Sequence, residues 1–115
     1  MIVGIGLDIT EVFRFSRAIE RAGMRERLFT AAEAEAPTER LAGRFAAKEA
    51  LAKAVGAPLG LVWTDVQVLA EDSGRPYFVF AGTVADRLAE LGVVNVFLSI
   101  THDAGVAAAM VVCES

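Results

Sequence analysis

A cluster of charges lies inside an alanine-rich stretch, residues 44–56, that has the composition of a helix and closes on Gly56. At about 100° per residue, Lys48 falls within the apolar face and Glu49 at its edge. Lys53 follows Glu49 by one turn. This spacing fits an exposed ion pair worth roughly 0.3–0.5 kcal/mol. Alternatively, the two residues stand at the rim of a pocket, where the carboxylate of Glu49 binds a metal ion and the ammonium of Lys53 binds a phosphate. The second interpretation requires another carboxylate.

Asp8 is the candidate for that second carboxylate. It stands near the end of an apolar run with two glycines, residues 2–9, which predicts a buried strand that delivers Asp8 to its end. Alternatively, Asp8 is an N-cap with Glu11 three residues later, an arrangement worth about 1 kcal/mol. The run lacks the third glycine of a dinucleotide-binding turn, so it does not favour such a site.

A basic stripe follows on residues 11–27, where apolar residues at helical spacing predict an amphipathic helix that ends or bends at Gly23. This segment contains five arginines and three glutamates, although the whole chain has a net charge of −4. The stripe includes Arg14, Arg17 and Arg21. Such a local reversal of charge fits either docking of an acidic protein or a solvated face with internal ion pairs.

Length and composition narrow the classes of protein. The 115 residues predict one domain spanning 1–115, and the hydrophobic share of 55% predicts burial of apolar surface between subunits. No apolar run is long enough to cross a membrane, so we expect a cytosolic protein with no membrane partner. The negative charge disfavours nucleic acid as a partner. With one cysteine and one histidine, no Cys/His metal cluster is expected.

The remaining pattern mixes helices with paired strands. Thr30 with Glu33 predicts an N-cap and a short helix, and Pro37 precedes the long helix that ends at Gly56. Further elements are expected as strands at residues 65–70, 76–80, 94–101 and 106–112 and a helix at 83–91. This order favours an α+β fold with a mainly antiparallel sheet and a long central helix. The lone His102, at a strand end, is by itself more typical of a structural residue.

Three motifs in one order carry a resemblance to a known family. They are Gly6-Leu7-Asp8-Ile9-Thr10-Glu11, Arg44-Phe45-Ala46-Ala47-Lys48-Glu49-Ala50 and Ser99-Ile100-Thr101-His102. Together they resemble the holo-[acyl-carrier-protein] synthases, the small 4'-phosphopantetheinyl transferases, over nearly the whole chain. The resemblance implies a trimeric enzyme with sites at subunit interfaces. It also implies magnesium-dependent transfer of 4'-phosphopantetheine from coenzyme A to a serine of apo acyl carrier protein, with release of adenosine 3',5'-bisphosphate, in support of fatty acid biosynthesis.

The resemblance also implies roles for individual residues. Asp8 and Glu49 become the magnesium ligands, Lys53 becomes the catalytic lysine, and Glu49 is also a candidate base. The residues implied in coenzyme A binding are Arg44, Lys48, Gly56, Pro76 and His102. Those implied in docking of the acidic carrier are Arg14, Arg17 and Arg21.

Two other functions stay open at this level. Two carboxylates, magnesium and a lysine would also serve a metal-dependent phosphohydrolase. A non-enzymatic coenzyme A-binding or oligomerising module would use Asp8 only as a cap and the pair Glu49–Lys53 only as surface charges.

Overall fold

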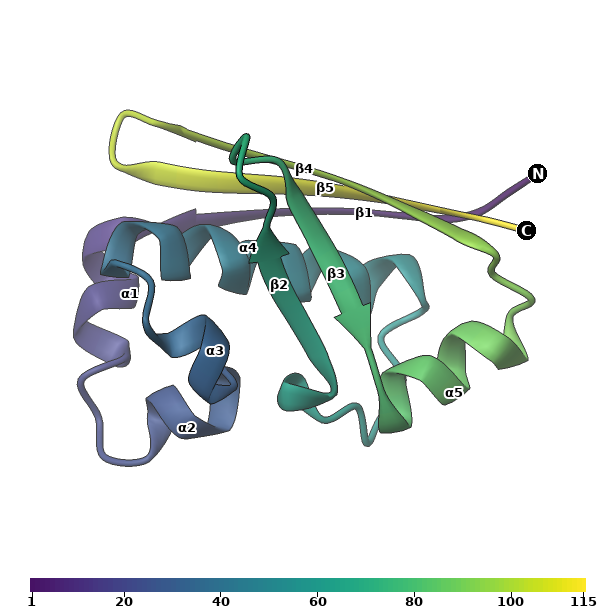
Figure 1. The fold of residues 1–115 in the computed structure, drawn as a ribbon, viewed down its shortest axis with the longest axis horizontal. Helices are drawn as coiled ribbons and strands as arrows, with labels where there is room; N and C mark the ends of the chain where they lie inside the picture. The colour runs from purple at the N-terminus through teal and green to yellow at the C-terminus, as the bar shows by residue number, and fades with distance from the viewer.

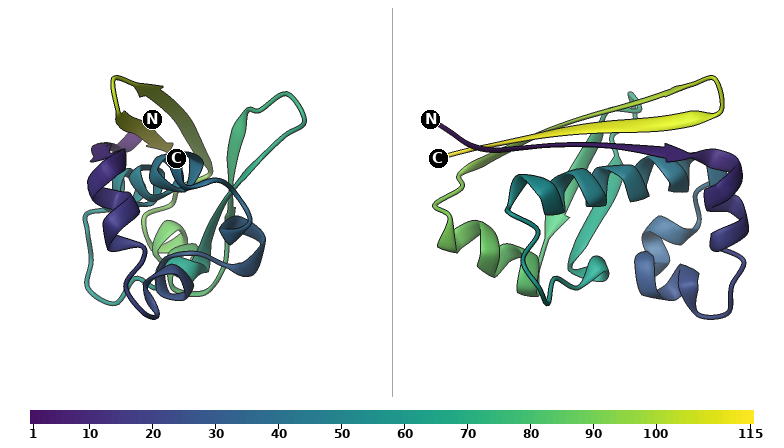
Figure 2. Two further views of the ribbon diagram at one scale, coloured as in Figure 1. Left: turned by 90° about the vertical axis from the view of Figure 1, so that its left-hand side faces the viewer. Right: turned by 180° about the vertical axis from the view of Figure 1, so that it is seen from behind.

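The long helix α4 (Thr38–Ala54) forms the centre of the fold in a computed structural model that describes residues 1–115. It lies under a three-stranded antiparallel sheet with the order β1 (Ile2–Glu11), β5 (Val106–Glu114), β4 (Asn95–Asp103). Figure 1 shows this sheet above the helix. The hairpin of β2 (Val66–Ala70) and β3 (Pro76–Phe80) flanks α4 on one side, as the end-on view of Figure 2 shows.

The other helices pack near the two ends of α4 (Figure 1). Helices α1 (Val12–Ala18), α2 (Met24–Leu28) and α3 (Ala31–Ala34) lie at one end. Helix α5 (Gly82–Glu90) lies at the other, and a short 3₁₀ helix, η1 (Trp63–Asp65), leads into β2. The α+β class with antiparallel sheets and a long central helix is therefore confirmed.

Small residues let α4 and the sheet approach each other closely. Ala46, Ala47 and Ala50 are fully buried on the helix. On β1, a Cβ at Gly4 or Gly6 would overlap the carbonyl oxygen of a helical alanine. The glycines of the first motif are thus required by packing between β1 and α4, because any side chain there would push the strand away.

The opposite face of β1 has no covering layer within the chain. The side chains of Ile5, Leu7 and Ile9 are 61%, 59% and 67% exposed, although they alternate with the inward-facing glycines. Met110 on β5 and Phe97 on β4 are also exposed. A large apolar surface on the outside of a sheet is typical of an interface between subunits.

The predicted start of a helix at Glu11 is wrong, whereas the predicted interruption at Gly23 is confirmed. Strand β1 continues to Glu11, which pairs with Val106, so the helical run begins only at Val12. Gly23 then adopts a left-handed conformation with φ of 79° and separates α1 from α2. Apolar spacing does not register the extension of β1 to Glu11, because the pairing partner, Val106, is far away in the sequence.

Most other boundaries agree with the sequence. Thr30 and Glu33 form the predicted capping box, in which each side chain accepts from the other residue's backbone N–H. Gly56, with φ of 88°, follows the end of α4, and the strands and α5 begin within one residue of their predicted starts. No helix has the length and apolar character that crossing a membrane requires.

Candidate functional site

Asp8 and Lys53 meet where β1 passes over α4. The ammonium of Lys53 donates to the carbonyl oxygen of Leu7 at 2.9 Å and to Asp8 Oδ1 at 3.3 Å. Thr10 donates its hydroxyl to Asp8 Oδ2 at 3.2 Å. Asp8 lies inside the strand instead of at its end, and Glu11 is the N-cap of α1 without a side-chain bond. The cap interpretation of Asp8 is therefore wrong.

Glu49 lies close enough to Asp8 for the two carboxylates to repel each other. Burial, and after it the negative charge of Asp8, raises the pKa of Glu49, while the charge of Lys53 opposes this shift. The expected surface ion pair between Glu49 and Lys53 does not form, since Lys53 pairs with Asp8. The ammonium remains half-exposed, with 52% of the side chain accessible.

Both carboxylates line one groove with a volume of about 560 Å³. Its walls come from β1, α1, α2, α4 and η1, and they include Phe45, Trp63 and two arginines, Arg14 and Arg27. The sequence had singled out Arg14 but not Arg27, because helical spacing does not place Arg27 on the face that Arg14, Arg17 and Arg21 share. Carboxylates at the floor and arginines at the wall can bind a cation and an acidic group side by side.

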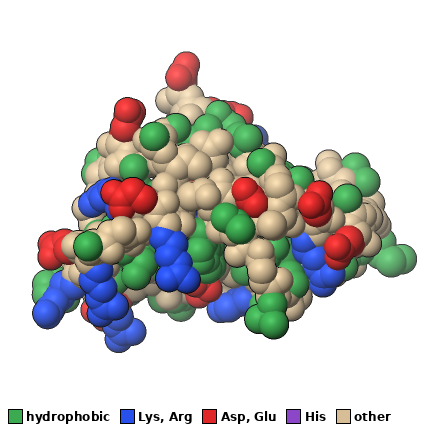
Figure 3. Space-filling model, turned by 90° about the horizontal axis from the view of Figure 1, so that it is seen from below, with side chains coloured by type: hydrophobic (Ala, Val, Ile, Leu, Met, Phe, Trp, Pro, Cys, Tyr) green, Lys and Arg blue, Asp and Glu red, His purple; other side chains and the backbone are tan.

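The other predicted docking residues lie near this groove. Arg17 is exposed on α1, and Arg21 is exposed in the turn that follows. None of the three salt bridges in the chain involves Arg14, Arg17 or Arg21. Figure 3 shows Lys and Arg side chains gathered toward the end of the molecule where α1 and α2 lie. Internal ion pairs, the alternative explanation for the stripe, are therefore not formed.

A second groove of about 520 Å³ contains three of the residues implied in coenzyme A binding, Arg44, Pro76 and His102. It also contains Arg40, which the sequence gave no reason to select. His102 Nε2 lies 3.1 Å from the carbonyl oxygen of Glu39, which it can contact only as a donor. Two guanidinium groups and an imidazole in one groove are suited to binding phosphate.

Gly56 lies apart from this second groove. It follows the C-terminal end of α4, near Lys53, whereas Arg44 stands in the first half of the helix. Twelve residues separate Arg44 from Gly56, or about 18 Å at the rise of an α-helix. The two grooves have no lining residue in common. Gly56 lines neither groove, so the residues predicted to bind coenzyme A do not all lie together on one chain.

The expected contact between Lys48 and coenzyme A is wrong. The side chain of Lys48 is 0% exposed, and its ammonium lies 2.7 Å from Glu33 Oε1. It also donates to the carbonyl oxygens of Leu28 and Trp63. Burial lowers the pKa of Lys48, and its bond to Glu33 opposes this shift. With three protein acceptors around it, the ammonium has no free side for a phosphate.

Comparison with known proteins shows the class of protein to which these features belong. The family model described as the 4'-phosphopantetheinyl transferase superfamily matches residues 4–111. The chain belongs to this superfamily. A holo-[acyl-carrier-protein] synthase of Streptomyces avermitilis is 54% identical over 120 residues, which cover 98% of each chain. The predicted resemblance to the holo-[acyl-carrier-protein] synthases, and with it the prediction of an enzyme, is confirmed.

Solved structures agree with the sequence comparison. The holo-[acyl-carrier-protein] synthase of Neisseria meningitidis superposes with a TM-score of 0.88 at 34% identity over the full length of both chains. A holo-(acyl-carrier-protein) synthase of Bacillus anthracis, solved in complex with CoA (3',5'-ADP), gives 0.80 at 37% identity, with coverage of 100% of this chain and 98% of that one. The non-enzymatic alternative is overturned, and a transferase family disfavours the phosphohydrolase.

Proposed function

We propose that this enzyme transfers 4'-phosphopantetheine from coenzyme A to a serine of an apo acyl carrier protein or carrier domain. The observation that carries the proposal is the groove in which Asp8 and Glu49, from different elements, meet beside Lys53 and under an arginine-bearing wall. The coenzyme A complex of the Bacillus anthracis relative supports the donor. The setting that we propose is fatty acid biosynthesis in the cytosol, as the resemblance implies.

The reaction joins the serine oxygen of the carrier to the phosphorus that bears pantetheine and breaks the bond from that phosphorus to the bridging diphosphate oxygen. Adenosine 3',5'-bisphosphate leaves. The raised pKa of Glu49 favours this carboxylate as the acceptor of the serine proton. Lys53, half-exposed and held beside Asp8, stabilises the charge that develops on the leaving phosphate. The carrier supplies the nucleophile, so the enzyme needs none.

The donor set fits magnesium. Asp8 and Glu49 are the carboxylates that would hold the ion, and magnesium in enzymes usually takes one or two carboxylates with substrate phosphates and water. No group of three or more His, Cys, Asp or Glu side chains lies together in the chain, so water and substrate would provide the other ligands. The repulsion that raises the pKa of Glu49 would be relieved by a cation between the carboxylates. When bound, the ion supplies positive charge to the diphosphate.

The carrier would dock on α1 and the turn after it. Arg14 reaches the groove itself, and Arg17 and Arg21 stand exposed without carboxylate partners within the chain. Unpaired exposed arginines beside a reaction site are suited to an acidic partner, whose approach they accelerate.

We further propose that the active form is a homotrimer with the site between subunits. The exposed apolar face around Ile5, Leu7 and Ile9 supports burial against another copy. The separation of the groove at Arg44 from the carboxylates supports it as well, since neither groove alone has both the carboxylates and the nucleotide-side residues. A coenzyme A molecule would then contact Asp8 and Glu49 of one copy and Arg44 and His102 of another.

The intact mass of an apo acyl carrier protein tests the proposal directly. Incubation with this enzyme, coenzyme A and magnesium should add one phosphopantetheine group, and adenosine 3',5'-bisphosphate should appear in equal amount. Asp8→Ala is the matched control, because Asp8 is partly exposed and not needed for packing. An unmodified carrier with hydrolysed coenzyme A would instead indicate the phosphohydrolase.

A further inference from the structure

Lys48 and Glu33 form a buried ion pair that the transfer chemistry does not use. Both side chains are 0% exposed, and Lys48 Nζ lies 2.7 Å from Glu33 Oε1. No buried side-chain nitrogen or oxygen in the protein is left without a hydrogen-bond partner. A buried pair of this kind is weak evidence for stability, because apolar residues of similar size often serve a fold equally well. A contribution to stability is therefore not enough to explain why the chain has this ion pair.

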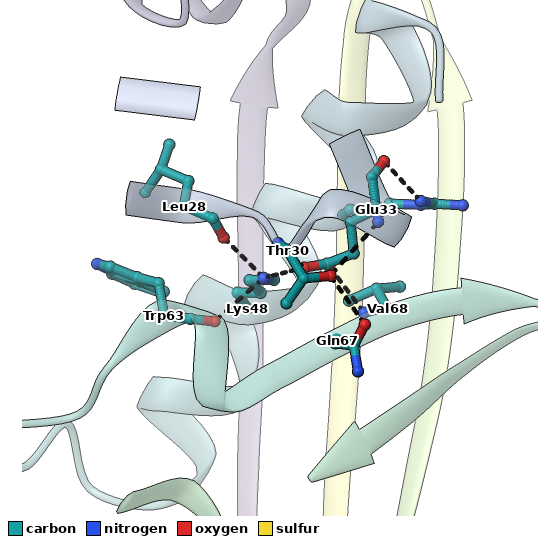
Figure 4. A network of polar contacts seen from close by, with 8 residues as sticks. Leu28, Thr30, Glu33, Lys48, Trp63, Gln67 and Val68 are labelled. Carbon is teal, nitrogen blue, oxygen red and sulfur yellow. Dashed lines mark hydrogen bonds and ion pairs between the residues drawn. The ribbon is translucent and has the colours of Figure 1, made fainter. Parts of the chain in front are cut away.

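The pair holds together segments that are far apart in the sequence (Figure 4). From α4, the ammonium of Lys48 donates to the carbonyl oxygen of Leu28 at the end of α2, at 2.7 Å, and to that of Trp63 in η1, at 3.1 Å. Glu33 accepts from the backbone N–H of Thr30 at 3.0 Å and from that of Val68 in β2 at 2.8 Å.

The two carbonyl groups bound by Lys48 belong to residues that line the Asp8–Glu49 groove. Leu28 and Trp63 stand in its wall, and Glu49 follows Lys48 directly on α4. Helix α2 is only five residues long and has no side-chain cap. So short a helix is not stable by itself, and its position depends on contacts such as the one from Lys48 to Leu28.

We propose that Lys48 and Glu33 are positioning residues that fix the α2–η1 wall of the groove and thereby set the fit of the acceptor carrier protein. The pair touches no substrate and acts through the placement of Leu28, Trp63 and the neighbouring Arg27. The inference rests on the proposed transfer to a carrier. It predicts that damage to the pair impairs carrier binding more than coenzyme A binding or turnover.

The double variant Lys48→Met/Glu33→Gln tests this role. It removes both charges together, since a single change would leave one buried charge without its partner. Methionine cannot donate to Leu28 or Trp63, whereas glutamine can still accept from Thr30 or Val68. We expect the KM for the carrier to rise at least tenfold, with the KM for coenzyme A and kcat at saturating carrier changed less than threefold.

Amide hydrogen exchange provides a readout independent of activity. In the double variant, exchange should accelerate in residues 24–34 and remain unchanged in α4 and the three-stranded sheet. Leu88→Ala is the control, because Leu88 is a buried residue of α5 and belongs to a different core cluster from Leu28 and Trp63. It should lower the melting temperature without changing the KM for the carrier.

Several outcomes would overturn the inference. These are an unchanged carrier KM, an equal rise in both KM values, or unchanged exchange in residues 24–34. If the double variant does not fold, Glu33→Asp alone decides, because the shorter carboxylate keeps a negative charge near Lys48 but withdraws from the backbone N–H groups of Thr30 and Val68. A carrier KM raised about threefold supports the role, and an unchanged one refutes it. Absence of transfer by the unmutated enzyme would refute the proposed function instead. Amide hydrogen exchange in residues 24–34 would still test whether the ion pair fixes the α2–η1 wall.

Discussion

Substitution of Gly6 by alanine should damage both stability and transfer, because β1 at this point almost touches α4. The new Cβ would overlap the carbonyl oxygen of Ala50 and would lie 2.7 Å from its carbonyl carbon and 3.0 Å from the nitrogen of Ala54. A relaxed contact needs about 3.5–4.0 Å, so strand and helix must separate by roughly 1 Å. Backbone atoms of a buried helix cannot rotate away.

The size of the effect follows from this separation. Overpacking of a core typically costs about 1–3 kcal/mol, and alanine recovers about 0.4–1 kcal/mol by restricting the unfolded chain. We expect a net loss of about 1.3 kcal/mol, which for a chain of this length lowers the melting temperature by about 5 °C. Asp8 lies two residues further on the same face of β1, so a shift of roughly 1 Å should lower kcat by about a hundredfold.

Thermal unfolding at one fixed protein concentration and steady-state transfer to a carrier measure both effects. The matched control is Gly43→Ala on α4, where the added Cβ would meet only the side chains of His102, at 2.8 Å, and Ile100, at 3.0 Å. Those side chains can move, and alanine favours a helix by about 1 kcal/mol. The control should keep or raise the melting temperature while weakening coenzyme A binding. A Gly6→Ala enzyme with normal melting and normal kcat would refute the close-packing argument.

Three further predictions concern the charged groups. Because the pKa of Glu49 is raised on folding, the folded protein loses stability as the pH rises from the usual glutamate range through the raised pKa. Without added metal, Glu49→Gln should therefore raise the melting temperature at neutral pH, and a lower melting temperature would contradict the shift. With magnesium present, the same variant should abolish transfer. The double variant Arg14→Glu/Arg21→Glu should raise the KM for the carrier at least tenfold and leave the affinity for coenzyme A unchanged. Added salt should weaken binding of the carrier to the unmutated enzyme. If calorimetry shows that the double variant loses equal affinity for both ligands, the carrier docks elsewhere. Lys53→Ala should lower kcat more than it weakens coenzyme A binding, and equal losses would make Lys53 a binding residue.

The sequence predicted the order and type of most elements because their signals are local. The capping box at Thr30, the stop at Gly56 and the alternating strands all depend on neighbours within a few residues. The convergence of Asp8 and Glu49 was accessible only through the family resemblance, since β1 and α4 are far apart in the chain. Their common groove supports that assignment.

The role of Lys48 could not be predicted in the same way. Its place inside the apolar arc of α4 was visible, but its partner Glu33 is fifteen residues away, in a helix of four residues. A lysine in an apolar arc can face either a ligand or a buried carboxylate, and only the packing of α3 distinguishes these cases. The positions of Arg27 and Arg40 in the two grooves could not be predicted either, because tertiary contacts form the grooves.

The strand order has a consequence for how the chain folds during synthesis. The last strand in the chain, β5, is the central one, and β1 pairs with β5 alone. When β1, α4 and the hairpin have left the ribosome, the sheet that covers α4 still lacks its middle strand. The hydrogen-bonding edge of β1 therefore has no strand partner until the C-terminal residues emerge, and these distant contacts slow folding. A ribosome that stalls before β5 should hold a chain that binds chaperones and resists native folding.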